Sequence, residues 1–144
     1  MNSTQIQLVK ESWGFVIVKS DEAGELFYSR LFEVAPGVRH LFKGDVKEQS
    51  RKLMSMVTLV VSKLDKLDTI ITDIKNLAVR HNKYGAKAEH YAVVGECLIW
   101  TLRAGLAERW TKQMEEAWLA VYTVLANAMV ENQRVASENT VTAL

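Results

Sequence analysis

The chain has few of the residues that interrupt helices or cross-link a fold. Its 144 residues include one proline, one cysteine and seven glycines. With so few chain-breaking residues, long uninterrupted helices are easy to accommodate, whereas a turn-rich β-sandwich is not. The single cysteine, Cys97, excludes an internal disulfide bond and is typical of a protein from a reducing compartment.

An excess of charge of one sign, an export signal and a long apolar run are also missing. The 18 basic and 17 acidic residues give a net charge of +1, without the basic surface expected of a nucleic-acid-binding protein. The N-terminal segment has no basic patch followed by an apolar run, so no secretory signal is visible. The longest uncharged stretch, 117–130, is too short to span a bilayer. We therefore expect a cytoplasmic protein that binds neither nucleic acid nor a membrane.

The residues that are present predict one all-α domain. Hydrophobic residues make up 49% of the chain, and they recur with helical rather than alternating spacing. We expect helices that begin near residues 4 and 21, a short helical piece after Pro36, and helices at about 47–63, 68–83, 88–106 and from 111 onward.

The ends of the chain carry two helix-capping patterns. Thr4 and Gln7 form a capping-box pattern at the first helix, and Thr111 is the expected cap of the last. The helical periodicity of apolar residues ends near residue 136. We therefore expect a domain at 1–135 and a frayed C-terminal tail at 136–144.

His81 lies on the apolar side of the helix expected at 68–83. Ile74, Leu77 and His81 recur at i, i+3 and i+7, so the imidazole points the same way as the core residues. A lone histidine in such a place is usually a hydrogen-bonded core or rim residue. The alternative is an iron ligand that leaves the opposite coordination position open to a gas. A ligand imidazole donates its other N–H, for which the backbone carbonyl near Leu77 is the expected acceptor.

Four further residues could line a slot opposite His81. Gln49 and Leu53 lie one turn apart on the helix expected at 47–63, and Tyr28 and Phe42 flank the proline. Taken singly, each has an ordinary role: a solvated amide, a phenol bonded to water or a carbonyl, or core packing. Taken together with His81, they form a helical slot that suits an iron porphyrin. The absence of a CxxCH motif predicts noncovalent haem b.

The other reactive side chains predict no further site. His40 and His90 have no second histidine, cysteine or carboxylate at metal-ligand spacing, so no zinc site is expected. Cys97 stands among apolar residues and is expected to be a small buried hydrophobe rather than a nucleophile. The sequence contains no glycine-rich phosphate loop and no nucleophile elbow.

The chain resembles the globin family over about residues 5–132. The resemblance is to bacterial single-domain globins, flavohaemoglobin haem domains and neuroglobin-like proteins. It is carried by a second-helix-to-corner segment, a distal helix, a proximal helix with the start of the next helix, and a final helix. In that order, these are LFYSRLFEVAPGVRHLF, EQSRKLMSMV, RHNKYGAKAEHYAVVGECL and AWLAVYTVLANAMV. The resemblance implies a globin fold, a three-over-three helical sandwich around haem.

The resemblance also implies a role for each residue of the slot. His81 corresponds to the proximal iron ligand, and Phe42 to the corner phenylalanine against the haem. Gln49 stands at the distal position, Leu53 is the pocket-lining residue that follows it, and Tyr28 is the distal tyrosine. Neuroglobin-like proteins carry a distal histidine that closes the sixth coordination site. Gln49 is a poor iron ligand, so we expect that site to be open or filled by water.

The residues around the slot match the family less uniformly. Lys52, Arg80 and Lys83 are candidate partners of the haem propionates, each with solvation as the ordinary alternative. Tyr91 matches the tyrosine that flavohaemoglobins place behind the proximal histidine, where it accompanies a glutamate. The position expected for that glutamate is Val135, which cannot make the imidazole a stronger electron donor.

Three functions are compatible with this pattern. The first is reversible, high-affinity binding of dioxygen and other diatomic gases for storage, scavenging or transport, in which the chain is a binding protein rather than an enzyme. The second is a nitric oxide dioxygenase or peroxidase-like activity, for which we expect a separate reductase. The third is a gas sensor that acts through a partner.

Overall fold

The regular structure of the described residues is entirely helical. The computed structural model describes residues 2–42, 44–83 and 88–143, with side chains except at 82, 83, 88, 133 and 135–143. The elements are α1 (Ser3–Ile17), α2 (Ser20–Val34), the 3-10 helix η1 (Pro36–Leu41), α3 (Val46–Ser62), the 3-10 helix η2 (Leu67–Ile70), α4 (Ile71–Lys83), α5 (Ala88–Leu106), the 3-10 helix η3 (Ala107–Arg109) and α6 (Lys112–Ala143). No strand occurs within these ranges, and the prediction of an all-α fold is confirmed.

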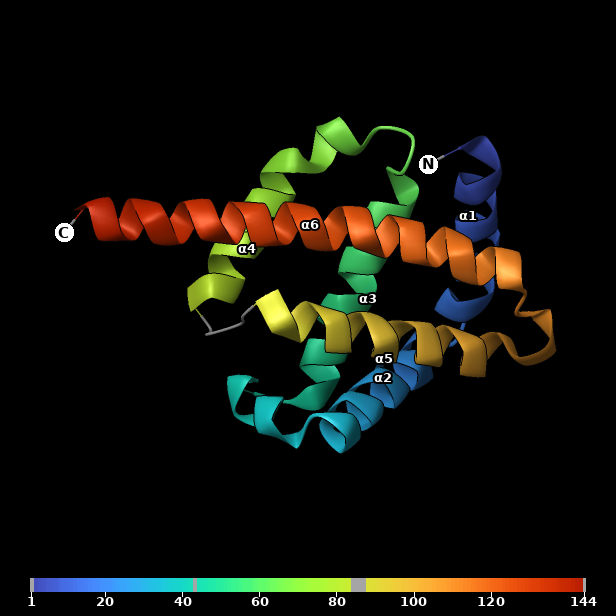
Figure 1. Cartoon of the computed structure of the whole chain (residues 1–144). Helices are drawn as coiled ribbons and strands as arrows, with labels where there is room; N and C mark the ends of the chain where they lie inside the picture. Colours follow the sequence, from blue (N-terminus) through green and yellow to red (C-terminus); the bar gives the residue numbers. More distant parts are fainter. Residues whose placement is uncertain (1, 43, 84–87, 144) are drawn as a thin grey trace.

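The helices form two layers of three. Helices α2, α5 and α6 make one layer, in which α5 and α6 lie side by side (Figure 1). Helices α1, α3 and α4 make the other layer. Contacts of α1 and α4 with α6, and of α2 with α3, join the two layers. The arrangement is the expected three-over-three sandwich.

The crossing of α2 and α3 is unusually close because Gly24 lacks a side chain. A Cβ atom at Gly24 would lie 2.6 Å from the Cβ of Ser50, closer than two such atoms can pack. The missing side chain lets the helices approach at this point. Tyr28 follows Gly24 by one turn, and Gln49 precedes Ser50 on the facing helix. The crossing therefore brings the two expected distal residues together.

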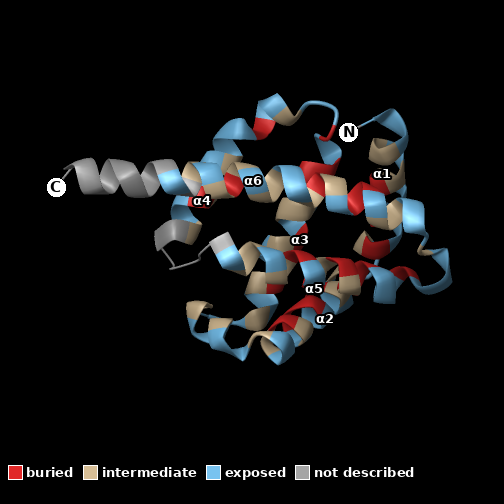
Figure 2. Ribbon diagram, viewed as in Figure 1, coloured by how far each residue is buried: buried red, intermediate tan, exposed pale blue. Residues whose placement is uncertain are grey.

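Two tryptophans tie α1 to the helices that cover it. The rings of Trp13 and Trp118 lie 5.8 Å apart between centroids, and both side chains are buried. Trp118 donates its indole N–H to Ser12 Oγ at 2.8 Å, and Trp13 donates to Thr58 Oγ1 at 3.0 Å. Because both indole donors are satisfied, the aromatic core carries no unpaired N–H at these positions. Figure 2 shows the buried residues gathered on the inward faces of the helices.

The capping box of the first helix is formed by Asn2 and Gln5, two residues before the predicted pair. Asn2 is the N-cap, its side chain accepts from the Gln5 amide at 2.8 Å, and the Gln5 side chain accepts from the Asn2 amide. The predicted pair Thr4 and Gln7 is wrong, because the helix begins at Ser3 and both residues lie inside it. The two overlapping patterns have the same spacing, so only the true start of the helix distinguishes them.

The last helix begins as predicted but is longer. Thr111 Oγ1 accepts from the Met114 amide at 3.1 Å, which confirms Thr111 as its cap. The helical backbone continues to Ala143, through the segment 136–143 where the sequence predicts a frayed tail. A helix propagates by its own local hydrogen bonds, so it can outlast the apolar pattern that buries it. Among residues 2–42, 44–83 and 88–143, none of the helices combines the length and hydrophobicity that a membrane span requires.

Candidate functional site

His81 presents a neutral imidazole with one nitrogen available. Its ring is half-buried on α4, and Nδ1 lies 2.9 Å from the backbone oxygen of Leu77, as the sequence analysis expects. A carbonyl only accepts, so Nδ1 carries the proton and Nε2 keeps a lone pair. Burial lowers the pKa of His81 and outweighs the Leu77 hydrogen bond, which raises it, while the nearby Arg80 charge lowers it further. Burial and the Arg80 charge therefore keep Nε2 unprotonated at neutral pH.

The Tyr28 hydroxyl is buried with a weak acceptor. Tyr28 is 6% exposed, and its hydroxyl lies 3.5 Å from the backbone oxygen of Gln49, at the outer limit of a hydrogen bond. Burial raises the pKa of Tyr28 to about 12, so the phenol keeps its proton at physiological pH. A desolvated donor with so long a bond can turn to a better acceptor that enters the site.

Phe42 and Leu53 close the space around Tyr28. The rings of Phe42 and Tyr28 meet edge to face with centroids 5.4 Å apart, and Leu53 packs into the same cluster. The Gln49 side chain is half-buried one turn before Leu53, and its amide has no hydrogen-bond partner within the described ranges. The four residues that the sequence assigns to the distal side are therefore adjacent, although they come from α2, α3 and the segment after η1.

Helix α5 connects this distal cluster to His81. Val93, Val94 and Leu98 pack against the cluster that contains Tyr28. Earlier on the same helix, the Tyr91 ring stacks on the His81 imidazole with centroids 6.4 Å apart and planes inclined by 20°. One rigid helix thus contacts both sides of the expected haem slot.

The candidate propionate partners face solvent. Lys52 pairs with Glu48 at 3.6 Å, one turn back on α3, and both side chains are about two-thirds exposed at 65% and 64%. Arg80 is exposed beside His81. The side chain of Lys83 lies outside the described residues. Neither exposed cation is held by a buried partner among the described residues.

The tyrosines of this region supply a test of the packing. Burial raises the pKa of Tyr28 and of Tyr91 to about 12, and raises that of Tyr122 further. The chain has four tyrosines, and the fourth, Tyr84, lies outside the described residues. We expect at most one tyrosinate to form below about pH 11 in the folded protein, whereas all four titrate near pH 10 in denaturant.

The corresponding stability change has a definite sign. A phenol with a raised pKa keeps its proton in the fold, so its stabilisation is complete below about pH 10 and is lost as the pH rises through about 12. Ultraviolet absorbance and circular dichroism recorded in one alkaline titration measure both quantities. Two or more tyrosinates formed below about pH 11 with full helicity would contradict the burial described above.

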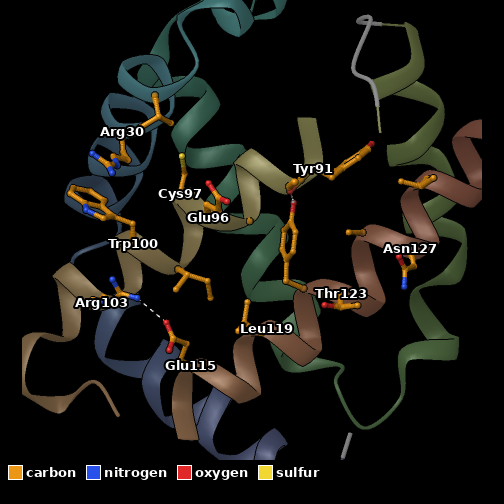
Figure 3. Close-up of a pocket in the computed structure, with 17 residues that line it drawn as sticks. Arg30, Tyr91, Glu96, Cys97, Trp100, Arg103, Glu115, Leu119, Thr123 and Asn127 are labelled. Atoms are coloured by element: carbon orange, nitrogen blue, oxygen red, sulfur yellow. Dashed lines mark hydrogen bonds and ion pairs between the residues drawn. The ribbon is translucent and has the colours of Figure 1, made fainter. Parts of the chain in front are cut away.

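A groove of about 660 Å³ lies between α2, α5 and α6 (Figure 3). Arg30, stacked over Trp100 at 5.1 Å, lines one part of it, and Tyr91 lines another. Cys97 also lines the groove but is only 2% exposed, and burial raises the pKa of its thiol. A protonated, covered thiol is a poor nucleophile, in agreement with the sequence-based expectation for Cys97.

Two residues that the sequence analysis did not assign to the site belong beside it. The Tyr122 hydroxyl donates to the backbone oxygen of Tyr91 at 2.5 Å, and Gly95 leaves the space that the Tyr122 ring fills. The sequence does contain one signal for Tyr122. A tyrosine on the apolar face of a helix needs a partner for its hydroxyl, although the sequence does not reveal which residue supplies it.

The donor set suits a metal that brings its own ligands. No group of three or more histidine, cysteine, aspartate or glutamate side chains that could hold a bare metal ion occurs in the described part of the chain. His81 offers a single nitrogen in a half-buried site. A porphyrin supplies four nitrogens to its iron, and the iron then needs only one nitrogen from the protein, so these residues fit haem.

The two-layer fold and the single imidazole define a globin. The globin family model matches residues 25–129, and the chain belongs to that family. Neuroglobin-1 of Oncorhynchus mykiss is 30% identical over 137 residues, which cover 85% of this chain and 86% of the relative.

The chain is also similar to bacterial proteins. One solved structure is that of an engineered carbene transferase, a candidate nitric oxide dioxygenase from Rhodothermus marinus. Its TM-score with this chain is 0.88 at 26% sequence identity, and the match covers 100% of this chain and 99% of the other chain. The flavohemoprotein of Vibrio cholerae is 28% identical over 74% of this chain, but the match spans only 28% of that longer protein.

Proposed function

We propose that this globin holds haem b through His81 and binds dioxygen reversibly on the opposite face. The observation that carries the proposal is the imidazole of His81, whose Nδ1 proton is committed to the Leu77 carbonyl 2.9 Å away. That bond orients the ring and leaves Nε2 as the ligating atom. Haem iron, when bound, supplies the coordination position at which a diatomic gas binds.

The distal residues favour retention of a polar ligand. Tyr28 offers a buried O–H whose present acceptor, the Gln49 carbonyl, is 3.5 Å away. The Gln49 side chain adds an amide N–H from the facing helix. Bound dioxygen carries partial negative charge, so two donors hold it more tightly than an apolar pocket does. The proposed function is therefore high-affinity storage, scavenging or transport.

If His81 holds haem, the remaining coordination position would stay accessible beside Gln49. An amide is a weak iron ligand, and the Tyr28 phenol keeps its proton because its pKa is about 12. Neither residue is suited to occupy the position opposite His81. Fast ligand binding to the ferrous form is expected, without the slow step that dissociation of an internal ligand imposes.

Titration of the purified protein with hemin tests the proposal. We expect one hemin per chain, a Soret band, and a ferrous deoxy spectrum typical of five-coordinate iron. Rapid mixing of the ferrous form with carbon monoxide then measures access to the sixth position. A protein that takes up no hemin would refute the function, and a slow phase independent of carbon monoxide concentration would refute the open position.

A second candidate function is nitric oxide dioxygenation with a separate reductase. It is favoured by the similarity over the full chain to the Rhodothermus marinus protein. Nitric oxide and dioxygen combine with one electron to give nitrate, so each turnover needs one electron from a donor. The chain has valine at 135, where flavohaemoglobins have glutamate, and this favours binding over rapid turnover.

Single-turnover and multiple-turnover assays separate the two functions. One equivalent of nitrate from the dioxygen-bound protein is expected from simple chemistry in either case. Sustained nitrate production with a bacterial flavin reductase and its nicotinamide donor would establish the enzymatic function, and its absence would leave the binding function.

A further inference from the structure

Tyr91 stacks on His81, the residue proposed to hold haem. Its ring lies nearly parallel to the His81 imidazole, with centroids 6.4 Å apart and planes inclined by 20°. An imidazole with one hydrogen bond to Leu77 can still tilt about that bond. The Tyr91 ring, placed against one face, limits the tilt. The orientation of His81 therefore depends on what holds Tyr91 in place.

Tyr91 is held by a hydroxyl from the facing helix. The Tyr122 hydroxyl on α6 donates to the backbone oxygen of Tyr91 at 2.5 Å. In an α-helix this oxygen also accepts from the amide four residues later, so the Tyr122 bond uses its second lone pair. Tyr91 is the fourth residue of α5, and the bond fixes the start of that helix to α6.

Gly95 sets the depth at which the Tyr122 ring lies. A Cβ atom at Gly95 would be 2.6 Å from Tyr122 Cε2 and 2.9 Å from Cδ2, so the phenol occupies the space of a side chain. Gly95 follows Tyr91 by one turn of α5. The ring of Tyr122 is therefore located by two points on one helix, its hydroxyl at Tyr91 and its edge at Gly95.

We propose that Tyr122 and Gly95 form a lock that positions Tyr91 against His81 and so sets the orientation of the proximal imidazole. The lock acts through a backbone carbonyl and ring packing. The inference rests on the proposed ligation of haem by His81. Tyr122 is a positioning residue and touches no ligand.

The first test removes the hydroxyl and keeps the ring. Tyr122→Phe should shift the iron–histidine stretching band in the resonance Raman spectrum of the ferrous protein, because the imidazole is freer to tilt. It should also speed transfer of hemin to an acceptor protein about 2-fold to 10-fold, the range expected for one lost hydrogen bond. The matched control is Thr101→Val. It removes another hydroxyl that donates to a backbone oxygen of α5, that of Cys97, at 2.8 Å. It should change neither quantity.

The second test displaces the ring and keeps the hydroxyl. Gly95→Ala forces the Tyr122 ring to move and should shift the same band in the same sense or further. Gly14→Ala is the matched control, because nothing lies within 4 Å of a Cβ atom at Gly14. Circular dichroism confirms that each variant is folded before it is compared.

The outcomes distinguish this inference from the proposed function. If the native protein holds hemin through His81 and Tyr122→Phe leaves both the Raman band and hemin loss unchanged, the lock is refuted while the function stands. If the native protein takes up no hemin, the function fails, and the lock is tested by the proton cross-peak between the Tyr91 and His81 rings. A weaker cross-peak in Tyr122→Phe than in Thr101→Val supports the lock, and an unchanged one refutes it.

Discussion

Replacement of His81 by glycine should abolish stable hemin binding. The proposed ligating atom is Nε2 of this imidazole, because Nδ1 is bonded to the Leu77 carbonyl at 2.9 Å. Removal of a group that only supports a metal ligand typically costs about 10-fold to 100-fold in affinity. Loss of the ligand itself should cost more. Hemin titration followed by the Soret band measures the effect.

Added imidazole distinguishes lost ligation from a damaged fold. The glycine variant leaves a space of imidazole size on α4, so free imidazole should restore the Soret band and the spectrum of the native protein. His40→Gly is the control, because His40 is exposed on η1. It should bind hemin as the native protein does. An unaltered ferrous spectrum in the His81 variant without imidazole would assign the iron to another ligand and end the proposal.

Loss of both distal donors should accelerate dioxygen release about 5-fold to 150-fold. Tyr28→Phe removes the O–H and Gln49→Leu removes the amide, and together such donors are worth about 1–3 kcal/mol to a bound ligand with partial negative charge. Neither change leaves a buried polar group newly unpaired, because the Gln49 backbone oxygen that Tyr28 contacts also accepts within α3. The fold should therefore tolerate both substitutions.

Flash photolysis or stopped-flow displacement of dioxygen by carbon monoxide measures the release rate. Each single variant should show part of the effect, and the double variant more than either. Gln7→Leu is the control, because Gln7 lies on the exposed face of α1, where its amide donates to Glu11. Release rates that are unchanged in both single variants would show that Tyr28 and Gln49 do not form the distal network.

The local parts of the site are predictable from the sequence. His81 and Leu77 lie on one helix four residues apart, so helical periodicity alone places the ring nitrogen near the carbonyl. Lys52 and Glu48 meet for the same reason. The choice between the two overlapping capping boxes, at Asn2 and at Thr4, needs the start of the helix, which cooperativity with the rest of the fold sets.

The contacts between residues far apart in the sequence could not be predicted in this way. Tyr28 reaches Gln49 across 21 residues, and Tyr122 reaches Tyr91 across 31. Both contacts depend on how closely two helices approach. That approach is set by Gly24 against Ser50 in one case and by Gly95 against Tyr122 in the other. A glycine in a sequence does not reveal which residue will fill its space.

Periodicity within single helices is enough to predict the helices, their approximate bounds and the side of α4 on which His81 lies. The distant acceptor of the Tyr28 hydroxyl, the stacking of Tyr91 on His81 and the bond from Tyr122 to Tyr91 emerge only when the helices pack together. The reason is physical: a side chain's partner on another helix depends on crossing distances of a few ångströms, which the packing of the whole chain fixes.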